Sequence, residues 1–542
     1  MIKRLLSMTA AVFMILTLAV GCSQNSEEMS ESDEDIQEIT LCESWSFESG
    51  FSTIVTPENN TNYALSFYLA NFYETLVNYE AGRIVPGLAE SWSVSEDGLV
   101  YTFNLREDVK FSDGADFNAA VVKKNLAMRP DLLGDYKAGF EMISLFKEAE
   151  IIDEHVIAVH LTSPYYGTLQ EFAKPMPLGM MSPNAFNEDG TLSDKLLTHS
   201  LGTGPYMSAG QSAENMYTFV RNPYYSREKP EVDRFNVRVI PDNDAKALAL
   251  RNNEIDMIFG ASKISHDGFR EFSEDRRYTG KVSAEKVITR FLGFNVSKEP
   301  FNDKQVRLAV NHAIDKESIA ANLFYGLETK ADNLLSRSLP YCDLELEPYA
   351  YNMEKARQLL EAAGWIDADG DGIREKGGQE LAGEILYKSG MAVNHDLALT
   401  IASSLKEVGM EIRVTDLDML AWHVEVQGGN YTIAHMKTYG IPFDPYLTIS
   451  HMGSEPLIAN KLAQGFVHVQ DGNSIIKGVT GMVDEQEIQQ QYDFILNEIH
   501  QNVSFVPISY IKELVVFNGD KIADYRFHGL PSQFDAAGIK LR

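Results

Sequence analysis

Residues 89–114 of the chain are AESWSVSEDGLVYTFNLREDVKFSDG. Within this stretch, apolar and polar side chains alternate over Val100–Leu105 with a period of two, which is the pattern of a strand with one buried face. The segment Glu96-Asp97-Gly98 lies just before it, and Asp followed by Gly favours a tight turn. We therefore predict that the strand at 100–105 is the second half of a β-hairpin.

Short strands and helices alternate irregularly along the rest of the chain. Residues 156–161 (VIAVHL) have the composition of another strand. Asn302 is placed to cap a helix that runs to Ile314 with its apolar residues on one face. A further helix is predicted over Met353–Ala363, and Gly364 follows as a suitable C-terminal residue. This mixture predicts the α+β fold class, with helices and sheets mixed.

The N-terminal residues have the pattern of an export signal. Two basic residues precede an apolar run from Leu5 to Val20, which is too short for a membrane-spanning helix. Gly21 and then Cys22 follow, and a small residue before a cysteine looks like a bacterial lipobox. We expect residues 1–21 to be removed as a signal peptide and Cys22 to be lipidated. The exported protein would then be held on the outer face of the cell membrane, or facing the periplasm of a host with two membranes.

The lipidated cysteine and the residues up to 37 are predicted to form a disordered tether. From Ser23 to Glu38 the chain has seven acidic residues, no aromatic residue and almost no apolar one. Such a segment cannot bury enough surface to fold. A flexible chain of this length spans roughly 20–25 Å, so the folded part could turn freely above the lipid.

Composition restricts the classes of partner. The formal net charge is −31, and it is about −26 for the body once the signal peptide and the seven tail acids are set aside. An acidic body argues against binding to nucleic acid. About 500 residues follow the tail, which is enough for two or three lobes. Apart from Cys22, only Cys42 and Cys342 are present, and their spacing leaves open whether they pair or stay free thiols.

No catalytic motif is present. The chain lacks a G-x-S-x-G elbow, an H-E-x-x-H helix, a C-x-x-C pair and a P-loop, so we expect neither enzymatic activity nor an intrinsic cofactor. Asp367–Gly372 (DADGDG) has the start of an EF-hand calcium loop, but Gly378 stands where that loop needs a glutamate. A turn between a helix and a strand is the better interpretation. His435 and His451, each followed by methionine, are either core residues or soft metal ligands, and His451 is kept as a metal candidate.

Six blocks along the chain carry a family resemblance. They are residues 89–114, 202–206 (GTGPY), 221–225 (RNPYY), 306–310 (VRLAV), 362–365 (AAGW) and 506–510 (VPISY). With these blocks in the family's order, the chain from about Glu38 onward resembles the extracytoplasmic solute-binding proteins that serve peptide and nickel ABC importers. A receptor or chaperone that uses the same fold without transport is the alternative.

The resemblance implies two lobes that hinge and close over a ligand, with no catalysis. The first lobe would comprise residues 38–284 and 509–542, and the second lobe residues 285–508. The ligand would lie between them, lined by aromatic residues and a few polar groups. The protein would be a monomer that delivers its ligand to a permease driven by an ATPase.

Three stretches are most similar to the nickel-binding branch, namely residues 72–82, 162–171 and 437–445. In those relatives a small carboxylate-bearing chelator carries the metal. An arginine of the first lobe grips the carboxylates, since a guanidinium meets a carboxylate with two hydrogen bonds. Aromatic residues and a histidine of the second lobe enclose the chelate. The implied ligand is therefore a nickel or other metal chelate, or a short peptide.

Several positions of this chain depart from that site. Met176 stands at the position of the gripping arginine, and Ser66 stands near the position of a methionine. Tyr439 replaces the enclosing tryptophan, and Phe443 replaces a tyrosine. The metal-binding histidine has no aligned counterpart, although His451 lies close in sequence. These changes weaken the resemblance to a carboxylate-chelate site and leave an aromatic wall suited to an organic ligand.

Four further residues complete the candidate ligand site. The match is gapped around Tyr136 and Lys137, where Lys137 could supply a replacement cation. Asp444 stands where an acid of the second lobe pairs with the ligand's α-amine in peptide-binding relatives, although Asp444-Pro445 also makes a good turn. Tyr446 ends the same stretch.

Overall fold

The structure is a computed structural model, and it describes the chain from Ile36 to the C-terminus with gaps. The described residues are 36–56, 63–80, 82–284, 288–389, 392–438, 445–450, 452 and 465–542. The predicted signal peptide, Cys22 and nearly all of the predicted tether lie outside them. Within the described part, no helix is both long enough and apolar enough to cross a membrane.

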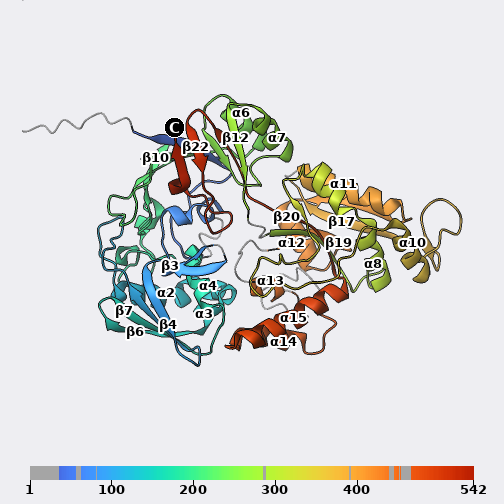
Figure 1. Cartoon of the computed structure of the whole chain (residues 1–542), viewed down its shortest axis with the longest axis horizontal. Coiled ribbons are helices and arrows are strands. Elements are labelled where there is room, and N and C mark those ends of the chain that lie inside the picture. Colours follow the sequence, from blue (N-terminus) through green and yellow to red (C-terminus); the bar gives the residue numbers. More distant parts are fainter. Residues whose placement is uncertain are drawn as a thin grey trace, which may run out of the picture. The chain divides into compact units, whose positions relative to one another are not determined.

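A seven-stranded sheet has the order β12-β21-β11-β1-β10-β9-β8. Two of its strands, β10 and β12, are labelled in Figure 1. β1 lies parallel to both of its neighbours, and the other pairs are antiparallel. β21 comes from the C-terminal part of the chain, so the chain leaves this sheet and later returns to it. The strands are β1 (Glu38–Glu43), β8 (Tyr206–Ala213), β9 (Met216–Arg221), β10 (Arg234–Val239), β11 (Met257–Phe259), β12 (Tyr278–Val282) and β21 (Leu514–Asn518).

The predicted hairpin belongs to a four-stranded antiparallel sheet of order β4-β5-β7-β6. Both predicted strands are confirmed, because β5 covers residues 100–105 and β7 covers residues 156–161. Gly98 has a φ of +68°, which glycine adopts without strain in the turn before β5. Phe103 of this sheet and Phe235 of the seven-stranded sheet lie in one hydrophobic cluster, so the two sheets share a core. The strands are β4 (Ala89–Val94), β5 (Val100–Leu105), β6 (Phe146–Asp153) and β7 (Val156–Leu161).

A six-stranded sheet has the order β14-β20-β13-β19-β17-β18. β17 runs parallel to β18 and to β19, whereas β13 is antiparallel to β19 and to β20. Neighbouring residues of β17 face opposite sides of the sheet: Ile385 clusters with residues of α11, and Leu386 clusters with Trp422 of α12. The elements are β13 (Ile288–Phe294), β14 (Thr329–Lys330), β17 (Ala382–Lys388), β18 (Glu411–Leu417), β19 (Ile433–Lys437), β20 (Phe505–Ile511), α11 (Ala392–Lys406) and α12 (Met419–Gln427).

Both predicted helices are present, with one correction. α8 spans Lys304–Ala313, and its N-cap is Asp303, whose carboxylate accepts a hydrogen bond from a backbone N–H of the first turn. The prediction that Asn302 caps this helix is wrong by one residue, because two residue types that favour the N-cap stand side by side. α10 spans Met353–Ala362, and Gly364 follows it with a φ of +84°, as predicted.

The remaining elements connect or cover these sheets. The helices are α1 (Tyr63–Ser66), α2 (Ala119–Leu133), α3 (Glu141–Leu145), α4 (Thr168–Phe172), α5 (Pro175–Leu178), α6 (Asn243–Arg251), α7 (His266–Glu274), α9 (Lys316–Ser318), α13 (Tyr446–Ile449), α14 (Gly472–Gly478) and α15 (Glu485–Asn502). The short strands are β2 (Val77–Glu80), β3 (Arg83–Pro86), β15 (Glu375–Lys376), β16 (Gln379–Glu380), β22 (Ile522–Tyr525) and β23 (Ile539–Leu541).

The chain passes between the seven-stranded and six-stranded sheets twice. The first crossing joins β12 to β13, and the second joins β20 to β21. Contacts between residues join Gln37–Arg542 into one compact unit. Because β20 pairs in the six-stranded sheet as far as Ile511, that sheet extends three residues beyond residue 508. The lobe boundaries expected at 284/285 and 508/509 stay predictions.

Both cysteines of the described residues are free thiols in separate cores. Cys42 clusters with Ile258 and Val516, whereas Cys342 clusters with Leu335. Burial raises the pKa of Cys42 to about 12, and burial also raises the pKa of Cys342. Both therefore stay protonated and unreactive at neutral pH.

Candidate functional site

Three parallel strands end at one edge of the six-stranded sheet, and this edge is the candidate ligand site. β17 ends at Lys388, β18 at Leu417 and β19 at Lys437. In open α/β sheets, ligands bind in the crevice outside the carboxyl ends of the strands. The predicted ligand residues at 439–444 follow β19 directly but lie outside the described residues, so their roles stay predictions.

A buried ion pair lies beside this edge. Arg290 of β13 donates from Nε and Nη2 to the two carboxylate oxygens of Glu328, at 3.1 and 2.7 Å. The hydroxyl of Ser509 on β20 also donates to Glu328. Burial alone would raise the pKa of Glu328, but Arg290, His266 and the Ser509 hydroxyl hold that pKa well below its usual range. Glu328 is therefore an anion held by partners from several elements.

His266 links this ion pair to the seven-stranded sheet. It lies at the start of α7, which packs on β12 and β21. Its Nε2 is 3.5 Å from Oε1 of Glu328, and its ring lies 5.5 Å from the ring of Phe324. A helix that packs on the seven-stranded sheet thus contacts an ion pair of the six-stranded sheet.

The sequence left open whether His435 and His451 are core residues or metal ligands. His435 lies in the core. It is 5 % exposed on β19, and its Nε2 is 3.3 Å from Nη1 of Arg290. Burial, with the nearby cations Arg290 and Lys437, lowers the pKa of His435 well below its usual value. The imidazole is therefore neutral at pH 7. His451 is outside the described residues, and its metal-binding role stays a prediction.

The other predicted site residues lie on separate elements. Ser66 ends α1 and donates from Oγ to the carbonyl oxygen of Tyr63 at 2.6 Å. Tyr136 is exposed and Lys137 lies beside it, in a short turn that follows α2. Met176 is half-buried on α5 and packs against the core of the seven-stranded sheet. Tyr446 begins α13 and is 6 % exposed in a core of the six-stranded sheet.

Of these residues, Tyr136 lines a large acidic hollow. The hollow has a volume of about 1130 Å³ and lies against the end of α2. Among the described residues, its lining has four carboxylates and no basic side chain. Lys137, expected as a replacement cation, is not among the lining residues. An anion would meet repulsion there. The carboxylates belong to Glu48, Asp131, Asp135 and Asp194.

A buried arginine fixes the segment that carries Met176. Arg129 of α2 is fully buried, and it donates from Nε to the carbonyl oxygen of Pro177 and from Nη2 to that of Gly179, both at 2.6 Å. Its Nη1 donates to the backbone and side-chain oxygens of Asn125. Burial lowers the pKa of Arg129 to about 9, so the guanidinium stays charged at pH 7. The position of Met176 therefore depends on α2.

Three tyrosines join the four-stranded-sheet side of the fold to α15. The hydroxyls of Tyr166, which lies between β7 and α4, and Tyr492 of α15 are 2.6 Å apart. Tyr341 stacks on Tyr492 at 5.2 Å and meets Tyr166 edge-on at 5.5 Å. This contact connects the two sides of the fold at a place other than the crossings.

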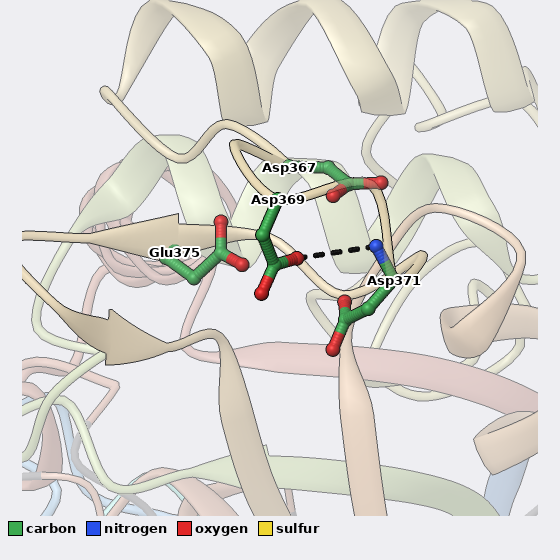
Figure 2. Close-up of side chains that lie close together, drawn as sticks. All are labelled: Asp367, Asp369, Asp371 and Glu375. Carbon is green, nitrogen blue, oxygen red and sulfur yellow. Dashed lines mark hydrogen bonds between the residues drawn. The ribbon is translucent and has the colours of Figure 1, made fainter.

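An exposed acidic loop confirms the predicted turn between a helix and a strand (Figure 2). Carboxylate oxygens of Asp367, Asp369, Asp371 and Glu375 lie within 4.8 Å of one another. These carboxylates accept backbone N–H bonds of the loop, as between Asp369 and the Asp371 N–H at 3.1 Å. The four carboxylates thus stabilise the turn by accepting hydrogen bonds from its backbone N–H groups.

Arg290, Lys388 and Lys437 were not among the predicted site residues. Two of them end predictable apolar strands, and a basic residue at the carboxyl end of a parallel strand is the signal that could have indicated them. The pairing of Arg290 with Glu328 spans 38 residues and leaves no local pattern.

Two sheets joined by two crossings, with a ligand edge beside those crossings, define the two-lobed class of solute-binding proteins. A sequence profile of the bacterial extracellular solute-binding proteins, family 5 (middle region), matches residues 83–457. The chain belongs to this family.

Three relatives place the chain within the family. The nickel-binding periplasmic protein of Escherichia coli (strain K12) is 32% identical over 446 residues, which are 82% of this chain and 84% of that protein. The glutathione-binding protein GsiB of Salmonella typhi is 28% identical over 365 residues, 66% of each. The crystal structure of NikA from Brucella suis in complex with Fe(III)-EDTA has a TM-score of 0.85 at 30% identity, covering 93% of this chain and 100% of that chain.

Replacing Arg129 with methionine should destabilise the protein by about 3 kcal/mol, because buried carbonyl oxygens lose their donors. Urea unfolding followed by tryptophan fluorescence measures this change. Arg276, which is exposed, offers a matched control, and Arg276→Met should change the free energy of unfolding by no more than about 0.5 kcal/mol. Equal effects of the two substitutions would contradict the role assigned to Arg129.

Proposed function

We propose that this protein is the solute-binding component of an ABC importer and captures a metal chelate, with nickel as the first candidate, or a short peptide. The observation that carries the proposal is the match to the NikA–Fe(III)-EDTA structure over 93% of this chain at a TM-score of 0.85. The nickel-binding relative, at 32% identity, supports a chelate, and the glutathione-binding relative supports a peptide. A permease and an ATPase would be the partners.

Capture would take place between the lobes. The lobes are proposed to meet at the two crossings, with the boundaries near residues 284/285 and 508/509. The carboxyl ends of β17 and β19 would face the ligand, followed by Tyr439, Phe443 and Asp444 in the predicted roles. His451 is the proposed metal contact for a chelate, and Asp444 is the proposed partner of a peptide amine.

Binding and release need no bond chemistry, so no catalytic residue is proposed. The family and the relatives are binding proteins, which supports this. The four carboxylates of the hollow beside Tyr136 favour a ligand with some positive charge, which a metal ion or a peptide amine would supply.

Native mass spectrometry of the body, purified without chelators, tests the ligand class. A bound mass with a transition-metal isotope pattern is the expected result for a chelate. Metal-free masses spaced by amino-acid residues would identify a peptide ligand instead. A body that carries no small molecule, and that binds neither Fe(III)-EDTA nor glutathione in calorimetry, would overturn the proposed function.

Met176 gives a test of the site itself. Met176→Arg should tighten binding of Fe(III)-EDTA at least about 10-fold in calorimetry, because a guanidinium can bond two carboxylate oxygens. Met176→Leu keeps the volume without the charge and should leave the affinity unchanged. An unchanged affinity of the arginine variant would contradict the alignment that places Met176 at the ligand.

The lipobox at Cys22 supports a lipid anchor on the outer face of the cell membrane. We expect the full-length protein to sediment with membranes after expression in a bacterial host. Cys22→Ser removes the thiol that would be lipidated, so the variant should move to the soluble fraction. Membrane association of the serine variant at the wild-type level would reject the anchor.

A further inference from the structure

Two lysines end adjacent parallel strands at the candidate ligand edge. Lys388 is the last residue of β17 and Lys437 is the last residue of β19, and both are half-buried. The two strands pair through Leu386 and Ala434, so these ends lie side by side at the carboxyl edge of the sheet. Ligands of open α/β sheets lie outside this edge.

Lys437 stands next to a second cation. In the antiparallel pair of β13 and β19 it is directly opposite Arg290. Directly opposed residues have Cβ atoms about 4.5–5.5 Å apart, and like charges in such a pair repel. Burial, followed by Arg290, lowers the pKa of Lys437 to about 8. At pH 7 Lys437 is still mostly charged.

The acids near Lys437 are already engaged. Glu328 bonds Arg290 with both of its carboxylate oxygens. Glu513 accepts hydrogen bonds from the backbone N–H of Ala261 at 3.2 Å and from the hydroxyl of Ser532 at 2.8 Å. Among the described residues, no carboxylate lies within 4.0 Å of the Lys437 ammonium. Its charge is therefore not neutralised by the described part of the chain.

Lys388 has neutral partners. Its ammonium lies 4.2 Å above the ring of Trp422 and 3.5 Å from Nε2 of His423. Burial, followed by Lys388, lowers the pKa of His423, so that imidazole is neutral at pH 7. A ring face attracts a cation without cancelling its charge. The described residues thus leave a second positive charge at the same edge.

We propose that Lys437 holds a carboxylate of the captured solute, with Lys388, whose side chain lies on the opposite, α12-facing side of the sheet, adding positive charge at the same strand ends. This inference rests on the proposed function and specifies the ligand as carboxylate-bearing. A carboxylate at the carboxyl ends of β17 and β19 would relieve the repulsion between Lys437 and Arg290. Lys437 would also supply the cation that Met176 cannot, so the contact to the carboxylate would move from α5 to the six-stranded sheet.

Calorimetry with two probes that carry carboxylates and one probe that carries none tests this contact. The probes are Fe(III)-EDTA, glutathione, and glutathione diethyl ester, in which both carboxylates are masked. We expect the wild-type protein to bind glutathione at least about 10-fold more tightly than the ester. Lys437→Gln should weaken binding of the acidic probes at least about 10-fold, and Lys388→Gln about 3-fold or more, with the ester affinity unchanged in both.

Two control variants separate the grip from general charge and from folding. Lys437→Arg keeps the cation and should bind the acidic probes within about 3-fold of wild type. Lys406→Gln removes an exposed lysine at the end of α11, paired there with Glu411, and should bind like wild type. If Lys437→Gln does not fold, the proposal is still tested by Lys388→Gln and by the affinities of the wild-type protein for glutathione and for its ester.

The proposed lysine–carboxylate contact would be overturned if Lys437→Gln and Lys388→Gln bind the acidic probes within 2-fold of wild type. An ester that binds wild type as tightly as glutathione would overturn it too. In both cases, solute binding by wild type would leave the proposed function standing. If wild type binds none of the probes and carries no ligand from the cell, the proposed function fails and the inference fails with it.

Discussion

The buried ion pair of Arg290 and Glu328 is the interaction on which the ligand edge depends. Taking two charges out of water costs several kcal/mol per ion, and the pair is stable only when its remaining bonding capacity is satisfied. Here Ser509 and His266 complete it. Arg290 and Ser509 belong to the adjacent strands β13 and β20, and Glu328 immediately precedes β14, the outermost strand on that side of the sheet. His266 comes from α7, which packs on the seven-stranded sheet. The same charge cluster therefore connects α7 to the six-stranded sheet.

The ligand edge contrasts with the hollow beside α2. At the edge, Lys388 and Lys437 carry positive charge that the described residues do not neutralise, whereas the lining of the hollow carries four carboxylates and no cation. The two regions thus carry opposite charge on different elements. Because the local field at a partly buried site is set by the nearest groups, the proposed carboxylate site is compatible with the negative charge of the whole chain.

Local patterns predicted the fold well. The hairpin turn at Gly98, the alternation in β5 and the end of α10 at Gly364 each depend on a few consecutive residues, and each is present. The cap of α8 was missed by one residue because Asn302 and Asp303 are both good caps. The charged site could not be derived in this way. Arg290 meets Glu328 and Lys437 only after distant strands pair, and no spacing in the sequence reports that pairing. Tyr439, Phe443, Asp444 and His451 lie outside the described residues and stay predictions.

The tyrosine contact of Tyr166, Tyr341 and Tyr492 has a thermodynamic consequence for solute capture. It is made between protein groups alone, so its free energy favours the conformation described here whether or not a solute is present. A solute that binds this conformation needs to supply less of the free energy of closure, and each 1 kcal/mol from the contact raises the apparent affinity about 5-fold. For a solute that binds this conformation, the same contact enlarges the share of solute-free protein that is already competent to bind. Such a solute would be retained more strongly. The solute-bound and solute-free protein would then differ less in conformation.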